Sequence, residues 1–334
     1  MTRPRRATIV DVAREAGVAA STVSRAFTRP ERVNHATRDH VLAVAERLGY
    51  TPNPLARALE TGRTGTFALL VPDITNPYFA GVIKGAERAA AAAGRTLVLG
   101  DTEESAGVEE QLLRRLGPAV DGFVLSASRL PDEELGRAQE LNALVLVNRA
   151  SPGVASVVAD FDHGTRQIVD HLASHGHRSI VFLGGPAESW SGARRWAGLR
   201  AAAEEQGLRL ARLGPYAPTL EAGPAAADAV LNARATAVVC HNDMLALGVL
   251  RRLAQRGIDV PGELSLVGFD NIFGSDLCTP ALTTLAEHTQ DAGSRAVETL
   301  LQLGQRRAGQ VPAWVLPTQL VVRSSTGPAP APRR

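Results

Sequence analysis

Residues 8–50 read TIVDVAREAGVAASTVSRAFTRPERVNHATRDHVLAVAERLGY, and this stretch decides the fold of the N-terminal part of the chain. Apolar side chains recur at its start with the i, i+3, i+4 and i+7 spacing of a helix, which we predict over residues 9–16. Thr8 can cap the start of this helix, and Gly17 can end it by allowing a sharp turn of the chain.

Two further helices follow this turn. One is predicted over about 20–27, and the other runs from the region of Asn34 or Thr37 to Leu48. Two short helices separated by a glycine-containing turn, with a third that closes the core, form the plan of a helix-turn-helix domain. Its second helix would enter the major groove of DNA, where Arg25 can make a bidentate pair with guanine. A small helical bundle without DNA binding has the same hydrophobic spacing and is the alternative.

The charge of the chain is unevenly distributed. Residues 1–65 hold eleven arginines and six acidic residues, a net charge of +5, whereas the whole chain of 334 residues carries only +2. The remainder therefore carries −3. A basic segment on a mildly acidic body indicates a polyanionic partner for that segment alone. An ordinary solvated basic terminus is the alternative at this point.

The overall composition is that of a globular protein, because 45% of the residues are hydrophobic and 21% are charged. No run of about 18 uncharged apolar residues is present to span a membrane. Asp11, Arg14 and Glu15 interrupt what would be the apolar core of a signal peptide. Two distant cysteines without a CxxC pair indicate neither a disulfide framework nor a zinc site. We therefore expect a cytoplasmic protein without a metal ion or a cofactor.

Four phrases carry a family resemblance. They are DVAREAGV at 11–18, STVSRAF at 21–27, TRDHVLAVAERLGYTPNPLARAL at 37–59 and VPDITNPYF at 71–79. In this order and spacing they resemble the lactose/galactose repressor (LacI-type) family of bacterial transcription regulators, and the match continues to LVVRSST at 320–326. The resemblance implies an N-terminal all-α helix-turn-helix headpiece. It also implies an α/β body like that of periplasmic binding proteins, with two doubly wound parallel-sheet subdomains.

The resemblance also assigns residues that contact DNA. It places Ala20, Ser21 and Arg25 at base-reading positions, and we expect Arg32 to assist them. Contacts to phosphates are expected from Thr8, Thr22, Ser24, Thr28 and Tyr50. Ala19 departs from the family because a serine usually caps the recognition helix there, and this departure affects one anchoring contact.

Residues 53–60, NPLARALE, match the hinge helix of the family. Pro54 suits a first helical turn, because its missing N–H would have no partner there. So short a segment cannot hold a helix alone in water, and the hinge helix of the family folds only on DNA and in a dimer. Leu59 occupies the place of the leucine that wedges into the minor groove, with Ala56 beside it and Asn53 at the start of the segment. Packing of Leu59 against its dimer mate is the alternative.

Beyond the linker at 62–65, short apolar runs such as FALLVP at 67–72 and SIVFLGG at 179–185 alternate with helical stretches rich in alanine and leucine. This alternation predicts parallel sheets covered by helices on both faces. Ligands of such folds bind beyond the carboxyl ends of the strands. Polar residues gather at these ends, namely Asp73, Asn76, Asp101, Ser126, Asn148, Asp160, Asn242 and Asp270.

The resemblance implies how the chain is divided. Residues 1–52 form the helix-turn-helix domain, 53–62 the hinge helix and linker, and 63–330 the effector-binding and dimerisation domain. Within the body, the N-subdomain covers about 63–160 and 291–320, and the C-subdomain covers about 161–290, with a sugar-sized cleft between them.

The resemblance places effector contacts at Asp73, Phe79, Asp160, Arg195, Asn242 and Asp270. An arginine, an asparagine and aspartates supply the donors and acceptors that vicinal hydroxyls need. We therefore expect a carbohydrate effector, with a nucleoside or purine co-repressor as the alternative. For each polar residue, a structural hydrogen bond at a strand end is the alternative role.

The chain departs from the family at two effector positions. Pro218 stands where many relatives have a stacking aromatic residue, and Ala286-Glu287-His288 stands where RQP or a similar triplet follows LTT. Trp190 and Trp196 could supply an aromatic wall instead.

No catalytic signature is present, because GGP at 184–186 lacks the glycines of a phosphate-binding loop and no nucleophile elbow, HExxH or Walker motif occurs. We interpret His163, His171, His175 and His177 as solvated or capping residues rather than metal ligands.

The sequence therefore predicts a homodimeric, nucleoid-associated repressor, not an enzyme, that binds a pseudo-palindromic double-stranded DNA operator. A sugar-binding transport or sensory protein would need a signal peptide, and a nucleotide-dependent enzyme would need a phosphate loop.

Overall fold

The computed structural model describes residues 7–51, 62–304 and 311–330. The chain forms two compact units, residues 1–65 and 66–334, each of which is described by itself. The first unit, the head, consists of α1 (Ile9–Ala16), α2 (Ala20–Thr28), the short 3-10 helix η1 (Pro30–Arg32) and α3 (His35–Arg47). The three-helix prediction is thus confirmed, and α1 has the predicted bounds.

Local signals determine where the helices of the head begin and end. The Thr8 hydroxyl accepts a hydrogen bond from the Asp11 amide, while the Asp11 carboxylate accepts from the Thr8 amide, which forms a capping box. Gly17 ends α1 in the left-handed conformation with φ of 66°. Asn34 caps α3 through its side-chain oxygen. The core between the helices holds Val12, Ala13, Ala16, Val23, Ala26, Val41, Val44 and Ala45.

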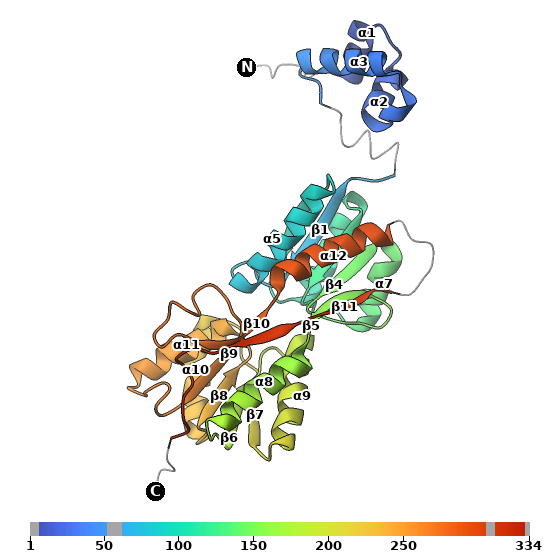
Figure 1. The fold of residues 1–334 in the computed structure, drawn as a ribbon. Helices are drawn as coiled ribbons and strands as arrows, with labels where there is room; N and C mark the ends of the chain where they lie inside the picture. The colour runs from blue at the N-terminus through green and yellow to red at the C-terminus, as the bar shows by residue number, and fades with distance from the viewer. Residues whose placement is uncertain (1–6, 52–61, 305–310, 331–334) are drawn as a thin grey trace. The chain divides into compact units, whose positions relative to one another are not determined.

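The second unit, the body, contains two six-stranded sheets (Figure 1). The first sheet has the order β11-β5-β4-β3-β1-β2 and is parallel throughout. Its strands are β1 (Thr66–Val71), β2 (Thr96–Asp101), β3 (Gly122–Ser126), β4 (Ala143–Val147), β5 (Ala155–Ala159) and β11 (Ala313–Leu316). The second sheet has the order β12-β10-β9-β8-β6-β7 and is parallel except for β12. Its strands are β6 (Ser179–Leu183), β7 (Arg209–Leu213), β8 (Ala237–Cys240), β9 (Ser265–Asp270), β10 (Thr283–Glu287) and β12 (Thr318–Val321).

Helices cover both faces of each sheet, as the alternating pattern predicts. On the first sheet they are α5 (Pro77–Ala92), α6 (Ala106–Leu116), η2 (Gly117–Ala119), α7 (Asp132–Leu141) and α12 (Thr289–Leu303). On the second they are α8 (Phe161–Ser174), α9 (Trp190–Glu205), η3 (Leu220–Ala222), α10 (Gly223–Asn232) and α11 (Asp243–Gln255). We call each sheet with its helices the first and the second lobe of the body.

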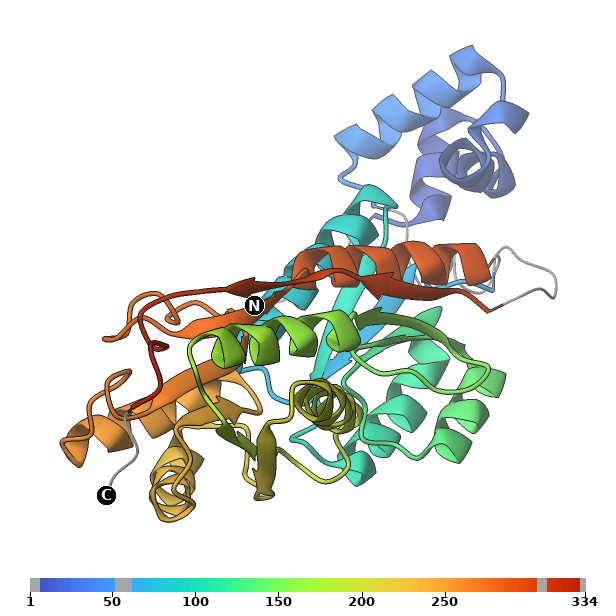
Figure 2. The ribbon, with the colours of Figure 1, turned by 60° about the horizontal axis from the view of Figure 1, so that its bottom comes forward.

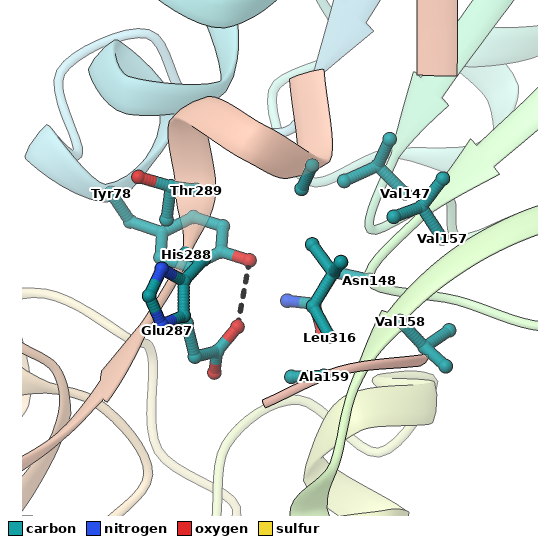
Figure 3. Close-up of a pocket in the computed structure, with 11 residues that line it drawn as sticks. Tyr78, Val147, Asn148, Val157, Val158, Ala159, Glu287, His288, Thr289 and Leu316 are labelled. Carbon is teal, nitrogen blue, oxygen red and sulfur yellow. Dashed lines mark hydrogen bonds between the residues drawn. The ribbon is translucent and has the colours of Figure 1, made fainter. Parts of the chain in front are cut away.

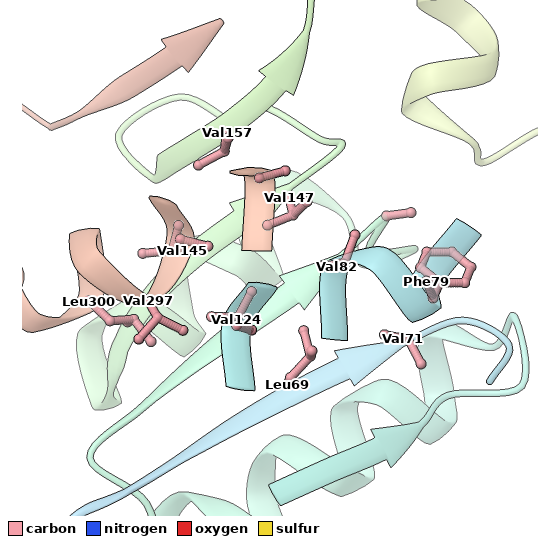
Figure 4. Packing of buried hydrophobic residues seen from close by; sticks show 14 of the residues in the cluster. Leu69, Val71, Phe79, Val82, Val124, Val145, Val147, Val157, Val297 and Leu300 are labelled. Carbon is pink, nitrogen blue, oxygen red and sulfur yellow. The ribbon is translucent and has the colours of Figure 1, made fainter. Parts of the chain in front are cut away.

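The strand β1 illustrates why the sheets are buried on both faces. Its residues alternate, so that Leu69 points into the core beneath α5 and α12, whereas Leu70 points into the core on the α6 and α7 side. Figure 4 shows the first of these cores, where Val82 of α5 and Val297 of α12 meet the strand side chains. The residues of β1 that are buried, 67–71, are therefore all apolar.

Helices α5 and α12 approach each other unusually closely, because glycines face the contact. A β-carbon on Gly85 would lie 1.9 Å from the carbonyl oxygen of Gln290, and one on Gly293 would lie 2.0 Å from that of Val82. The Ser294 hydroxyl donates to the carbonyl of Gly85 at 3.0 Å. Glycine is required at both positions because any side chain would push the helices apart.

The chain crosses between the lobes three times, and Figures 1 and 2 show these connections together beside the end of β5. The crossings follow β5, β10 and β11. The Asp160 amide donates to the Leu316 carbonyl at 2.8 Å, and the Thr318 hydroxyl donates to the Asp160 carbonyl at 2.9 Å. Asp160 thus ties the first and third crossings together. The returning segment contributes α12 and β11 to the first lobe, whereas β12 pairs with β10 in the second.

Over the described ranges, no helix is long and apolar enough to cross a membrane.

Candidate functional site

Helix α2 presents a polar face away from the core of the head. Val23 and Ala26 are buried beneath it, while Ser21 and Arg25 are exposed. Within the described part of the chain, Arg25 makes no ion pair, so its guanidinium is available to a ligand. Arg32, in η1, is exposed as well. A row of exposed polar side chains on a short helix is the arrangement that reads base edges in the major groove.

The other residues predicted to contact DNA surround this face. Ala20, Thr22, Ser24 and Thr28 are partly exposed on α2, and Thr8 is exposed at the start of α1. Tyr50 packs edge-on against Phe27, with 5.9 Å between the ring centres, and burial raises the pKa of its phenol. Ala19 starts α2 without a side-chain hydrogen bond, as its sequence predicts. Asn53, Ala56 and Leu59 lie outside the described residues.

In the body, strained backbone marks the carboxyl ends of the strands. Outside glycine, positive φ angles are uncommon, yet they occur at Glu104 after β2, Ala127 after β3, Asn148 after β4, and Asp270 at the end of β9. The φ of Asp270 is 104°. Backbone strain of this kind accumulates at functional sites. It marks the edge where parallel sheets bind ligands.

Arg195, on α9, is the centre of the polar cluster at this edge. Its Nη1 donates to the carbonyl of His241 at 2.5 Å, and its Nη2 donates both to Oδ1 of Asp270 and to Oε1 of Glu287, each at 2.9 Å. The guanidinium is enclosed by the rings of Phe161 and Phe269, whose centres lie 5.1 and 4.6 Å from its carbon. The side chain is 3% exposed, so these contacts act in a low-dielectric environment.

Glu287 connects this cluster to the other lobe. The hydroxyl of Tyr78, at the start of α5 in the first lobe, donates to Oε2 of Glu287 at 3.0 Å. Figure 3 shows this hydrogen bond at the crossing between β10 and α12, with Asn148 facing it from the end of β4. A hydrogen-bonded chain therefore runs from Tyr78 through Glu287 and Arg195 to Asp270, and it joins the two lobes.

Burial shifts the pKa values of these groups. It raises the pKa of the Asp270 carboxyl well above its usual range, which Arg195 opposes and Glu287 reinforces. It raises the pKa of Tyr78 well above its usual range too, with help from the charges of Glu287 and Asp270. The pKa of His241 falls well below its usual range because of burial and of nearby Arg195, Arg129 and Arg212. His241 is therefore neutral at pH 7.

A third buried carboxylate lies behind the cluster. Asp243, in the first turn of α11, accepts hydrogen bonds from the hydroxyls of Thr284 and Ser275 at 2.6 and 2.7 Å and from the Ile272 amide at 3.0 Å. Burial raises its pKa to about 6, against the effect of these three donors. Because Thr284 lies in β10 and Ile272 follows β9, Asp243 holds the loop that begins at Asp270.

The structure brings some predicted effector residues together and places others at its margin. Arg195 and Asp270 are in direct contact, and Phe79 lies beside Tyr78 with 5.1 Å between the ring centres. Asn242 caps α11 and donates to the carbonyl of Pro218 at 3.0 Å. Asp160 caps α8, and Asp73 accepts from the amide and hydroxyl of Thr75, so both carboxylates have structural bonds of their own.

Sequence reasoning did not assign Tyr78 and Glu287 to the site. Tyr78 belongs to the phrase VPDITNPYF, and Glu287 was noticed only as a departure from the family triplet. The two residues are 209 positions apart in the sequence, so no local pattern indicates the contact between them. Trp196 stacks on Phe182 in the second lobe, with 6.1 Å between ring centres.

The histidines on and after α8 have structural partners. The prediction of a solvated or capping role is wrong for His177, which is fully buried and bonds to the hydroxyls of Thr236 and Ser265 and to the Gly327 carbonyl. His171 bonds to the Thr326 hydroxyl at 2.9 Å. Among the residues that the structure describes, no group of three or more potential ligands is placed to hold a metal ion.

The chain resembles known proteins over nearly its whole length. The model of bacterial regulatory proteins of the lacI family matches residues 8–53, and that of the periplasmic binding protein-like domain matches 169–326. The chain is 33% identical to the HTH-type transcriptional repressor CytR of Escherichia coli (strain K12), with 97% of each chain covered. It is 34% identical to the HTH-type transcriptional regulator GalR of the same strain, with 90% of each covered.

Solved structures agree with these relatives. The lac repressor dimer bound to operator and the anti-inducer ONPF superposes with a TM-score of 0.86 at 26% identity, covering 97% of this chain and all of that one. The transcriptional regulator CelR in complex with cellobiose gives a TM-score of 0.71 at 28% identity, covering 96% of this chain and all of that one. The chain belongs to the LacI family of bacterial regulatory proteins.

Proposed function

We propose that this chain is a homodimeric transcriptional repressor that binds a pseudo-palindromic operator. Its affinity for the operator depends on a small molecule bound between the lobes of its body. The observation that carries this proposal is the hydrogen-bonded chain Tyr78–Glu287–Arg195–Asp270, because it joins the two lobes at the edge where parallel sheets bind ligands. A similar protein was solved as a dimer on its operator with an anti-inducer, and another with cellobiose.

The switch works through differential affinity. An effector that binds one arrangement of the lobes better than the other shifts the population toward that arrangement. We expect a change in the arrangement of the lobes to move residues 62–65, which lead into β1. The two copies in a dimer then present their heads at a different separation.

We assign the reading of bases to Arg25, with Ser21, Ala20 and Arg32, and the phosphate contacts to Thr8, Thr22, Ser24, Thr28 and Tyr50. Asn53, Ala56 and Leu59, outside the described residues, are proposed as the hinge contacts in the minor groove. We propose that the effector is bound by a central set of residues, Arg195, Asp270, Asn242, Tyr78, Phe79 and Glu287. Further contacts to it, at the edge of the site, are proposed for Asp73 and Asp160. The site of action is the cytoplasmic nucleoid, where the operator lies.

Selection of bound sequences from random duplexes tests the DNA half of this proposal. The full-length protein should enrich a pseudo-palindrome, and adding the effector should change the measured affinity for it. Thermal-shift screening against sugars and nucleosides tests the other half, since a bound ligand raises the midpoint of unfolding. Stabilisation by purines or nucleosides alone would replace the carbohydrate by the other effector class. The absence of any preferred duplex would refute the proposal.

A further inference from the structure

The charges around Arg195 do not balance. A single nitrogen, Nη2 of Arg195, donates to the carboxylates of both Asp270 and Glu287 at 2.9 Å. The side chains of these three residues are only 3–5% exposed. Asp243 adds a third buried carboxylate behind them, bonded to two hydroxyls and one amide rather than to a cation. Burying carboxylates that lack a cation is expensive unless a proton or a positive ligand compensates them.

The other groups that face the cluster do not supply the missing charge. Tyr78, from α5, is a neutral donor, and His241 is kept neutral by burial and by the arginines around it. Of the two other arginines near His241, Arg129 is itself paired with Glu104 at 2.5 Å, and Arg212 is exposed and lies over the ring of Trp196. His288, next to Glu287, has a half-exposed side chain that faces Asp291, with 3.4 Å between Nδ1 and Oδ2.

A small cavity adjoins Glu287 on the side of the first lobe. Its volume of about 10 Å³ is roughly that of one water molecule or one ammonium group. Apolar side chains such as Val147 and Leu316 form much of its wall, and the polar part comes from Tyr78, Asn148, Glu287, His288 and Thr289 (Figure 3). Asn148 is 6% exposed, and its Oδ1 has no hydrogen-bond partner among the described residues.

The cavity therefore combines a buried carboxylate with a second, unused acceptor in a space that fits one small polar group. We propose that the effector carries a protonated primary amine and that this group occupies the cavity against Glu287 and Asn148, which makes the ligand class an amino sugar rather than a neutral carbohydrate. A hydroxyl group could donate a hydrogen bond there, but an ammonium group would also bring a positive charge beside Glu287. This inference rests on the proposed function of the cleft as the effector site.

Matched ligand pairs test the proposal on the full-length protein. Glucosamine against glucose, and galactosamine against galactose, differ only by an amine in place of a hydroxyl. Isothermal calorimetry and thermal shift at pH 7 should show at least about tenfold tighter binding of an amino sugar than of its neutral partner. Equal binding within each pair, or no binding of either amine, overturns the proposal. Preference for cytidine over uridine without any response to the amino sugars also overturns it, because a neutral N–H donor would then suffice.

Variants distinguish an effect of the charge of Glu287 from an effect of its structural contacts. Glu287→Gln keeps the shape of the side chain, removes its charge and should abolish the preference for the amine. Tyr78→Phe removes a bond to Glu287 but keeps the charge, so the preference should persist. Glu298→Gln, on the exposed part of α12, is the matched control and should behave as the native protein. Persistence of the preference in Glu287→Gln, or its loss in Tyr78→Phe, refutes the assignment. Operator binding, measured on the same samples, reports separately on the proposed function.

Discussion

The exposed polar face of α2 in the head and the polar cluster of the body use arginine in opposite ways. Arg25 is exposed on α2 and, among the described residues, makes no ion pair, whereas Arg195 is 2% exposed and contacts two carboxylates, a carbonyl and two aromatic rings. The first can bind a partner without breaking any internal contact. The second can bind only by exchanging contacts it already has, which is how a ligand can change the conformation of the body.

Replacing Arg195 should have the largest effect. Arg195→Met leaves Asp270 and Glu287 buried without their cation, and we expect the body to lose about 3–5 kcal/mol of unfolding free energy. Urea denaturation followed by tryptophan fluorescence measures this, because all three tryptophans belong to the body. Arg194→Met is the control, since Arg194 makes an exposed ion pair with Asp162 and should cost at most about 1 kcal/mol. Equal losses in the two variants would contradict the role of Arg195 as the centre of the cluster.

Asp243 should make the stability of the body depend on pH. Its folded-state pKa of about 6 lies above the unfolded value of 3.8, so the folded state binds the proton more tightly. This stabilisation is present below pH 4 and is lost as the pH rises through 6, a change of about 3 kcal/mol. The difference in unfolding free energy between the native protein and Asp243→Asn, measured between pH 4 and 7, should show this slope.

Asp243→Asn should also be less stable at low pH, because asparagine keeps only one acceptor oxygen, and at least one of the three donors would then face an NH2 group that cannot accept, at a cost of about 1–3 kcal/mol. If the difference between the two proteins were independent of pH, Asp243 would not be the group that titrates.

Arg25→Ala should weaken operator binding without affecting the body. Loss of a bidentate pair with guanine costs about 1–3 kcal/mol of binding free energy and relaxes the preference at one base position in each half-site. Gel-shift titration and footprinting on the selected operator measure both effects. Arg47→Ala serves as the control, because Arg47 pairs with Glu15 on α1 instead of lying on α2. An unchanged sequence preference in Arg25→Ala would show that another face of the head reads the bases.

Ala19→Ser should have the smallest effect, and in the stabilising direction. Residue 19 begins α2 in an extended conformation without a side-chain hydrogen bond, and a serine there can cap the helix for about 1 kcal/mol. Hydrogen exchange of the α2 amides in the full-length protein should slow by about fivefold, while the body amides keep their rates. Unchanged exchange in α2 would indicate that its first turn already has another partner.

The secondary structure of this chain could be predicted well because its signals are local. The bounds of α1 follow from Thr8 and Gly17, and the alternation of apolar strands with helices predicts the doubly wound sheets. The missing side-chain cap at Ala19 follows in the same way from its methyl side chain. Arg195 and Asp270 were predicted as effector contacts through the family resemblance, and the structure places them in contact at 2.9 Å.

The contacts of the site were less accessible to sequence reasoning. Glu287 meets Arg195 of its own lobe across 92 residues and Tyr78 of the other lobe across 209, and the second contact depends on how the two lobes meet at the crossings. Asp243 lies in the first turn of a helix, where a carboxylate is usually solvated, so its position in the sequence gives no sign of its burial.

The amino-acid sequence by itself determined the helices of the head, the alternation of strands and helices in the body, and the family to which the chain belongs. These depend on spacings of a few residues, which propensity, capping and burial set locally. Only the tertiary structure decided which polar groups share one buried cluster and that its carboxylates outnumber its guanidinium. That balance of charge depends on side chains from four separate elements and on the low dielectric that their packing creates around them.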